Sequence, residues 1–290
     1  MTGSALTQHV QHIEALCSYL YTQWGLHALM AAEQEFYLQG EAVKPRQPHW
    51  DALQLVCNNE TITLEEIKPE DGDKQFEISL PPTYPLTLAP ALAGLRTTLD
   101  VWAQEHGWQA NFAAKPYPNQ PGSALHLHIH LEDDSGKNVF TKNDDAMSLP
   151  LTHSLGGLLA TMAESMVFFV PDEVGYARFD GSDHTPSTVC WGANNRTTAL
   201  RLPDKRTQQK FIEHRISSAN ADPYAAIAAI LAGIVYGLEQ QVDPGEQIFG
   251  NAGDTHYQLP MLPASMAEAR QRFESQGIVN SILERSANAA

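Results

Sequence analysis

The sequence predicts an α+β domain in which helices flank a largely antiparallel sheet. The expected strands do not alternate strictly with the expected helices, and several successive strands are joined by short turns, a pattern that favours antiparallel pairing. A chain of 290 residues has the length of one large or two small domains. No linker-like segment divides it, so we expect residues 1–290 to form a single domain.

Apolar residues at helical spacing identify the first predicted helix, over residues 6–24. Val10, Ile13 and Leu20 share one face of it, and Gly25 ends it. Later helices are predicted over residues 51–57, 86–106, 151–169, 222–238 and 265–275. After the last of these we expect a polar, alanine-ended tail.

Short apolar runs bounded by turn residues identify the predicted strands. They cover residues 26–38, 61–68, 74–80, 109–115, 123–131, 197–202 and 211–216. Two stretches are expected to be loops: residues 39–50, which are polar and contain prolines, and residues 171–195. The Gly156–Gly157 pair lies inside a predicted helix, where we interpret it as a packing site.

The charge balance excludes several classes of protein. The chain has 18 basic and 34 acidic residues, a net charge of −16, which argues against nucleic-acid or anionic-membrane binding and suits the binding of cations. The longest uncharged apolar run, Pro223–Leu238, has 16 residues. This run is shorter than the roughly 20 residues that span a bilayer. It therefore predicts a buried helix and argues against a membrane protein. Three widely separated cysteines and the lack of a recognisable targeting segment favour a cytoplasmic protein.

Charged and polar residues interrupt four of the predicted strands. Because side chains on a strand alternate between its faces, residues two apart point the same way. Each strand therefore has one polar face, made by Glu33 and Glu35, by Gln75 and Glu77, by His126, His128 and His130, and by Glu213 and Arg215. Burying such groups without partners costs free energy, so we expect the four faces to meet.

Converging carboxylates repel one another unless a cation lies between them, and carboxylate and imidazole groups are normal ligands of Mg²⁺ or Mn²⁺. Each face alone has a plainer explanation. A Glu-x-Glu pair can be solvated, His-x-His-x-His can be a zinc site or an amphipathic edge strand, and the two remaining pairs can be exposed. Together, in a chain with few charges, the four faces favour a functional site.

Three arginines are expected near the acidic faces: Arg196, Arg201 and Arg215. Guanidinium groups suit phosphate and carboxylate groups. Divalent cations beside several arginines are typical of a phosphoryl-transfer site that handles a nucleotide. Neither a phosphate-binding G-x-x-x-x-G-K-[ST] loop nor a dinucleotide-binding G-x-G-x-x-G motif occurs.

Five segments, in this order, resemble the catalytic domain of the glutamine synthetase superfamily, and most closely that of the γ-glutamylpolyamine (γ-glutamylputrescine) synthetases. They are EQEFYL (33–38), EDGDKQFE (70–77), FAAKPYPNQPGSALHLHIHL (112–131), WGANNRTTALRLP (191–203) and IEHRISSANADPYAAIAAILAG (212–233). The resemblance implies a curved, largely antiparallel sheet flanked by helices, a fold shared with the guanidino kinases. The curved sheet would form a funnel, with the nucleotide binding at one mouth and glutamate at the other.

The resemblance implies two or more divalent ions, Mg²⁺ or Mn²⁺, as cofactors. Their ligands would be five carboxylates and one imidazole. One ion would take Glu35, Glu70 and Glu77, and the other would take Glu33, His126 and Glu213.

The resemblance also assigns groups to the substrates, which would be ATP, an amino acid and an amine larger than ammonia. His128 would approach ATP, and Gly122 and Arg178 would contact the amino acid. The three arginines named above would hold the transferred phosphoryl group and the substrate carboxylate. ATP would phosphorylate a γ-carboxylate, and the amine would displace phosphate to give an amide. The cations and arginines would stabilise the charge that develops.

The sequence departs from the family pattern in several places. It opens with the helix that follows the family's small N-terminal β-domain, and the family's last helical segment does not follow its end. We therefore expect a monomer, a small oligomer or a partner subunit of a longer synthetase. Gln208 and Phe211 replace basic residues that precede IEHR in the family. The flap over residues 175–187 keeps Arg178 but has Asp183 or His184 near the position of the usual glutamate.

Two other functions are open at this point. One is a non-catalytic metal- or nucleotide-binding homologue that acts as a regulator or partner subunit. The other is a phosphotransferase of guanidino kinase type. Phosphate release that requires both a carboxylic acid and an amine distinguishes a ligase from both.

Overall fold

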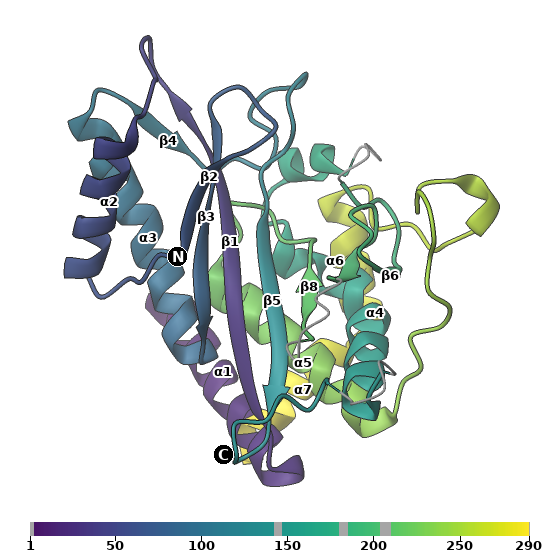
Figure 1. The fold of residues 1–290 in the computed structure, drawn as a ribbon. Helices are drawn as coiled ribbons and strands as arrows, with labels where there is room; N and C mark the ends of the chain where they lie inside the picture. The colour runs from purple at the N-terminus through teal and green to yellow at the C-terminus, as the bar shows by residue number, and fades with distance from the viewer. Residues whose placement is uncertain (1–2, 142–146, 180–184, 204–209, 290) are drawn as a thin grey trace.

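The computed structural model describes residues 3–141, 147–179, 185–203 and 210–289. Its centre is an eight-stranded sheet in the order β2-β3-β1-β5-β8-β7-β6, with β4 paired to β1 (Figure 1). The strands are β1 (His27–Gln39), β2 (Glu66–Pro69), β3 (Gln75–Thr83), β4 (Gln109–Asn111), β5 (Leu125–Glu132), β6 (Trp191–Ala193), β7 (Leu200–Leu202) and β8 (Ile212–His214). Every pairing is antiparallel except that of β6 with β7, which confirms the predicted α+β class.

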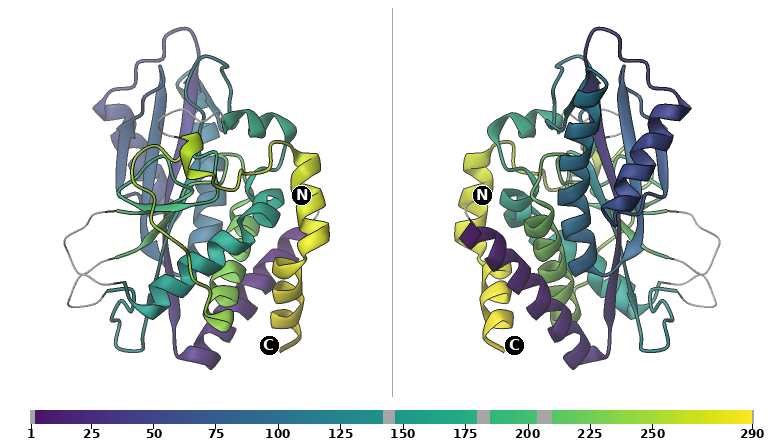
Figure 2. Two further views of the ribbon diagram at one scale, coloured as in Figure 1. Left: turned by 90° about the vertical axis from the view of Figure 1, so that its right-hand side faces the viewer. Right: turned by 90° about the vertical axis from the view of Figure 1, so that its left-hand side faces the viewer.

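Helices flank this sheet, and most of them form a second layer beside it (Figure 2). They are α1 (Gly3–Trp24), α2 (Gln47–Asn59), α3 (Pro85–Glu105), α4 (Leu149–Phe169), α5 (Pro223–Gln240), α6 (Met266–Gln276) and α7 (Ile278–Ala289). Two short 3₁₀ helices, η1 (Glu173–Arg178) and η2 (Thr255–Tyr257), lie in the connections. Apolar side chains of β1 and β5, such as Met30 and Leu127, join the helices in one large core.

Helix α5 lies at the centre of the helical layer and packs against α4 and α1. It is long and apolar enough to cross a membrane, but most of it is buried inside the domain, as in a core helix. Glycines allow its close approach to α4. A Cβ atom on Gly157 would lie 2.2 Å from the carbonyl oxygen of Gly233, and one on Gly237 would lie 2.0 Å from that of His153. The glycine pair in α4 is therefore a packing site, as its sequence indicates.

Several segments differ from the sequence prediction. The second expected loop, over residues 171–195, contains η1 and β6, and two further differences concern helices. Helix α2 begins at Gln47, inside the expected loop, and Pro48 lies in its first turn. Proline is tolerated there because backbone N–H groups in the first turn make no hydrogen bond within the helix. The expected C-terminal tail contains α7, whose Val279 and Ile282 are buried in the main core. The carboxylate of Glu164, fully buried in α4, accepts hydrogen bonds from the backbone N–H groups of Ile278 and Val279, both at 3.1 Å. This long-range cap lies 114 residues from the helix that it stabilises, so local sequence does not reveal it.

Glu164→Ala should lower the free energy of unfolding by about 1–3 kcal/mol, because it removes the acceptor from two N–H groups at the start of α7. Chemical denaturation monitored by circular dichroism measures the loss. Glu164→Gln keeps one acceptor oxygen and should lose less. Equal stability of the alanine variant and the unmodified protein would contradict the capping role.

Candidate active site

The strand register brings the polar faces of six strands together. Glu35 of β1 lies opposite Glu77 of β3, which lies opposite Lys68 of β2. One pleat along, Glu33 lies opposite His126 of β5. Directly opposite residues on one face are close neighbours in an antiparallel pair. Charged residues that alternate along each strand therefore lie next to charged residues of the neighbouring strands and form one cluster on the sheet.

The same register continues on the other side of β5. His128 lies opposite Glu213 of β8, and Glu213 lies opposite Arg201 of β7. A cavity of about 620 Å³ opens over this polar face. All the expected site residues except His128 line it: Glu33, Glu35, Glu70, Glu77, Gly122, His126, Arg178, Arg196, Arg201, Glu213 and Arg215. The structure thus brings together the residues whose roles the sequence predicts, and the roles themselves stay predictions.

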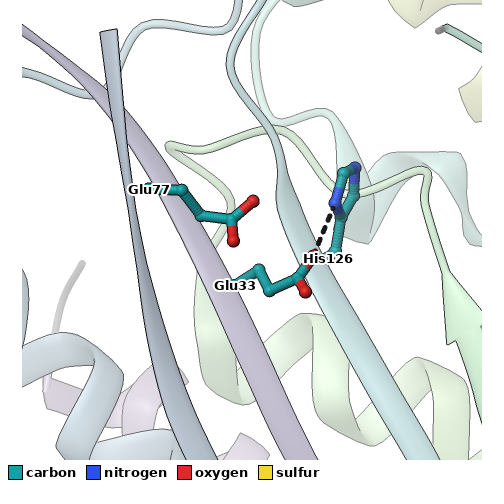
Figure 3. A group of neighbouring side chains, drawn as sticks. All are labelled: Glu33, Glu77 and His126. Carbon is teal, nitrogen blue, oxygen red and sulfur yellow. Dashed lines mark hydrogen bonds and ion pairs between the residues drawn. The ribbon is translucent and has the colours of Figure 1, made fainter. Parts of the chain in front are cut away.

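His126 lies at the centre of the acidic cluster. Its Nδ1 is 3.3 Å from a carboxylate oxygen of Glu33, 3.9 Å from Glu213 and 4.0 Å from Glu35. Figure 3 shows Glu33, Glu77 and His126 converging from three neighbouring strands. Donor atoms of these three residues lie within 4.8 Å of one another, as do those of Glu33, His128 and Glu213. Each group can hold a metal ion, although the grouping differs from the predicted division of ligands between two ions.

Burial and mutual repulsion change the pKa values in this cluster. Burial, reinforced by Glu70 and Glu77, raises the pKa of Glu35 to about 8 against a hydrogen bond from the N–H of Ala124. Burial and the nearby Glu33 raise the pKa of Glu77 to about 7. Carboxyl groups that resist ionisation in this way gain most from a cation among them. The donor set, oxygen-rich with one imidazole, fits Mg²⁺ or Mn²⁺.

In the other part of the cluster, around Glu213, arginine side chains supply the positive charge. Burial would raise the pKa of Glu213, but Arg215, His126 and Arg201 hold it below the usual value. Arg215 donates to one oxygen of Glu213, and Arg201 donates to the other at 2.7 Å. For His126, burial and Arg215 lower the pKa to about 4, so the ring is neutral near pH 7, as a metal ligand must be. The arginines are therefore fixed at the edge of the acidic cluster.

His128 lies beside the cavity rather than in its lining. Its Nε2 is 3.5 Å from an oxygen of Glu33, and its ring stacks on Phe211 with centroids 4.7 Å apart. The approach of His128 to a nucleotide stays a prediction. Phe211, where the family has a basic residue, supplies an aromatic face at this position.

Arg178 is buried, and the loop before β5 is shaped around it. Its guanidinium donates to the carbonyl oxygen of Ile216 at 2.5 Å, and a Cβ atom on Gly122 would lie 2.5 Å from its Cγ. Gln75 donates to the carbonyl oxygen of Gly122 at 2.9 Å, and Tyr37 donates to that of Pro121 at 2.8 Å. The two residues expected to contact the amino acid are therefore in mutual contact, and only glycine fits beside Arg178.

Gly122→Ala should displace Arg178 or the loop, and we expect about a tenfold or greater increase in KM for the amino acid with a smaller effect on kcat. Steady-state kinetics with varied amino acid measures this. Gly136→Ala is a control at an exposed turn where a Cβ would have open space, although its positive φ causes some strain. An unchanged KM would contradict the proposed substrate contact.

The sequence prediction missed several residues of the cavity. The cavity is also lined by Lys68, Asp71, Lys115 and Thr185, which no pattern above assigns to the site. Lys68 is two residues from both Glu66 and Glu70, so the alternation of side chains along a strand is the one signal that could have predicted it on the same face as Glu70. Three residues at places where the sequence departs from the family lie outside the described residues: Asp183 and His184 of the flap, and Gln208.

Comparisons with known proteins show what this chain is similar to. The chain is 33% identical over 260 residues to γ-glutamylputrescine synthetase PuuA of Escherichia coli, and the match covers 79% of this chain and 55% of that protein. It is 32% identical to glutamate–isopropylamine ligase of a Pseudomonas species, with 73% and 47% covered, and 30% identical to γ-glutamylethanolamide synthetase GlnA4 of Streptomyces coelicolor, with 74% and 45% covered. The chain thus spans about half the length of the curated relatives that it matches.

The solved structure of a GmaS–ADP complex superposes with a TM-score of 0.85 at 23% identity, covering 96% of this chain and 70% of that one. This likeness shows a shared fold. Residues 27–289 match the family described as glutamine synthetase, catalytic domain. The chain therefore belongs to the glutamine synthetase catalytic-domain family.

Proposed function

We propose that this protein is an ATP- and divalent-metal-dependent carboxylate–amine ligase that forms a γ-glutamyl amide through an acyl phosphate. One observation carries the proposal: a single cavity holds an acidic cluster fit for cations directly beside fixed arginines. The first can hold the cations that accompany ATP, and the second can hold a phosphoryl group in transfer. The three relatives given above are named as synthetases and ligases that form amides, and they support the same reaction class.

The acidic residues of the cavity are proposed to hold two ions, Mg²⁺ or Mn²⁺. Such ions neutralise phosphate oxygens during transfer. The protein holds the acceptors in place through the sheet register, and Glu35 is fixed further by the N–H of Ala124, 2.8 Å from its carboxylate. Ligands fixed in this way need little rearrangement when cations bind.

The arginines are proposed to stabilise the transferred phosphoryl group. Arg201 and Arg215 are held by Glu213, and Arg201 also donates to the side-chain oxygen of Asn194 at 2.7 Å. Arg196 lines the same cavity and is exposed. Two oriented guanidinium groups and one exposed guanidinium can surround a phosphoryl group from several sides, which lowers the free energy of the transition state.

The substrates are proposed to be glutamate or a similar amino acid and an alkyl amine larger than ammonia. Arg178 and Gly122 border the cavity where the amino acid would bind. The amines in the names of the relatives are putrescine, isopropylamine and, by the amide formed, ethanolamine. A monomeric or small oligomeric state and a cytoplasmic location stay predictions.

The test is phosphate release from ATP with Mg²⁺ or Mn²⁺ in the presence of an acid, an amine, both or neither. A ligase should release phosphate fastest when both are present and should form the amide. Transfer to a guanidino compound without an amide product would favour the phosphotransferase. No turnover with any acid, combined with binding of ATP analogues in calorimetry, would favour a non-catalytic homologue.

Amide formation should rise steeply above neutral pH, while glutamate-stimulated ATP hydrolysis changes less. Only a neutral amine attacks an acyl phosphate, and an alkyl ammonium group has a pKa of about 10 without assistance. The family's usual base on the flap is not retained, and its nearest replacement, His184, lies outside the described residues. Phosphate release and amide product are compared at pH 7 and pH 9. Equal ratios of amide to phosphate at both values would contradict weak activation of the amine.

A further inference from the structure

Lys68 of β2 lies at the edge of the acidic cluster, and the proposed reaction assigns it no role. Its Nζ is 2.8 Å from an oxygen of Glu77 and 3.6 Å from an oxygen of Glu70. The side chain of Glu77 is only 4% exposed, whereas that of Lys68 is 39% exposed. An ammonium group that reaches in from solvent thus pairs with a buried carboxylate that is expected to bind metal.

The position of Lys68 follows from the register of the sheet. The short strand β2 pairs with β3, and Lys68 lies directly opposite Glu77. Glu77 in turn lies opposite Glu35, which places the ammonium group at the end of a row of two carboxylates. Glu70 follows β2 closely, and its N–H donates to the carbonyl oxygen of Gln75 at 2.9 Å. The backbone therefore holds both carboxylates within reach of the same lysine.

An ammonium group and a divalent ion cannot share these carboxylates without mutual repulsion. The charge interaction is strong at such separations in a partly buried site. Loss of the lysine in the metal-free protein would leave Glu77 buried beside Glu35 and Glu33 without its paired cation. The lysine therefore stabilises the site without metal and opposes its occupation by metal.

We propose that Lys68 is a tethered cation that competes with a divalent ion for Glu70 and Glu77 and so sets the metal affinity of this half of the cavity. The inference rests on the metal ligands of the proposed function. When an ion binds, the ammonium group leaves the two carboxylates and its flexible, partly exposed side chain turns toward solvent. Metal binding at this position is then weaker than the carboxylates alone would give.

The experiment measures Mn²⁺ binding by calorimetry and Mn²⁺-dependent melting temperatures for the full chain. Lys68→Met should bind Mn²⁺ about tenfold or more tightly than the unmodified protein at this position, because a neighbouring positive charge is gone. Without metal it should melt at a lower temperature, and Mn²⁺ should raise its melting temperature by more. Lys68→Arg keeps the charge and should resemble the unmodified protein. Lys44→Met, in an exposed loop, controls for the loss of one positive charge.

Unchanged or weaker Mn²⁺ binding by Lys68→Met would overturn the inference, and so would tight binding by Lys68→Arg. If the unmodified protein binds Mn²⁺ and only the effect of Lys68 is missing, the proposed metal ligands stand and this inference alone fails. If no variant binds Mn²⁺, both fail. Lys68→Gln, which keeps a hydrogen-bond donor, provides the same comparison if the methionine variant does not fold.

Discussion

Arg196→Ala should lower the rate of ATP-dependent amide formation by about 10²- to 10³-fold, the range found when one donor to transition-state charge is removed. The melting temperature should not change. Arg196 lines the cavity with an exposed side chain, which makes no hydrogen bond or ion pair with the other described residues. Its removal therefore takes charge from the cavity without breaking a buried network.

The control for Arg196 is Arg272→Ala. Arg272 is exposed on α6 and pairs with Glu268 at 3.6 Å, a surface contact of little energetic value. This variant should keep full activity and nearly full stability. Unchanged activity of Arg196→Ala would contradict its catalytic role and leave the charge stabilisation to Arg201 and Arg215. A large drop in melting temperature would instead show that Arg196 has a structural role.

Glu35→Gln should abolish most Mn²⁺-dependent activity and also make the metal-free protein more stable at alkaline pH. The pKa of Glu35 is raised to about 8 by burial and by Glu70 and Glu77, and the pKa of Glu77 is raised to about 7. In the unfolded chain both groups ionise near their ordinary pKa of about 4.3. Between the two pKa values the folded state holds protons that the unfolded state has lost. Stability from these two groups therefore falls as pH rises from about 4.3 to about 8.

Buried histidines give the opposite slope at acid pH. Burial lowers the pKa of His126 to about 4 and that of His214 to about 3, each assisted by a nearby cationic group. Stability is lost as pH falls below about 6.5, where the unfolded histidines bind protons and the folded ones do not. The two effects oppose each other between about pH 4.3 and pH 6.5, so the metal-free protein should lose stability mainly as pH rises from about 6.5 to 8.

Chemical denaturation between pH 5 and pH 9, with and without Mn²⁺, measures these slopes. Glu35→Gln should flatten the alkaline slope, each unit of pKa difference between folded and unfolded states being worth about 1.4 kcal/mol. Mn²⁺ should stabilise the unmodified protein more at pH 8 than at pH 6, because bound cations favour the ionised carboxylates. The control is Glu14→Gln, on the exposed face of α1. An alkaline slope that is equal in Glu35→Gln and the unmodified protein would contradict carboxylate crowding.

The period-two spacing of charges along β1, β3, β5 and β8 was sufficient to predict that the polar faces meet. Glu33 and Glu35, for example, had to share a face, because alternate side chains of a strand always do. The strand register then places them against His126 and Glu77. This part of the site was predictable because strand parity is a local property of the sequence and burial of unpartnered charge is costly everywhere.

The resemblance to the family predicted roles for residues that no local sequence pattern identifies. Arg178 lies in the short helix η1, far along the chain from Gly122, and nothing in their spacing indicates that the two side chains touch. The family order predicted both as substrate contacts. The structure adds the physical reason for the glycine, which is the steric requirement of Arg178.

The sequence alone determined the α+β class, the strands that carry the site and most of the residues that line the cavity. The tertiary structure decided which groups pair: Lys68 with Glu77, Glu213 with two arginines, and Glu164 with the start of α7. These contacts join residues that are between 2 and 115 positions apart, and their energies depend on burial and distance. Burial and distance exist only once the chain has folded. The alternation of side chains along the strands and the order of the motifs could therefore place the charges on the sheet, but could not say which of them neutralise one another.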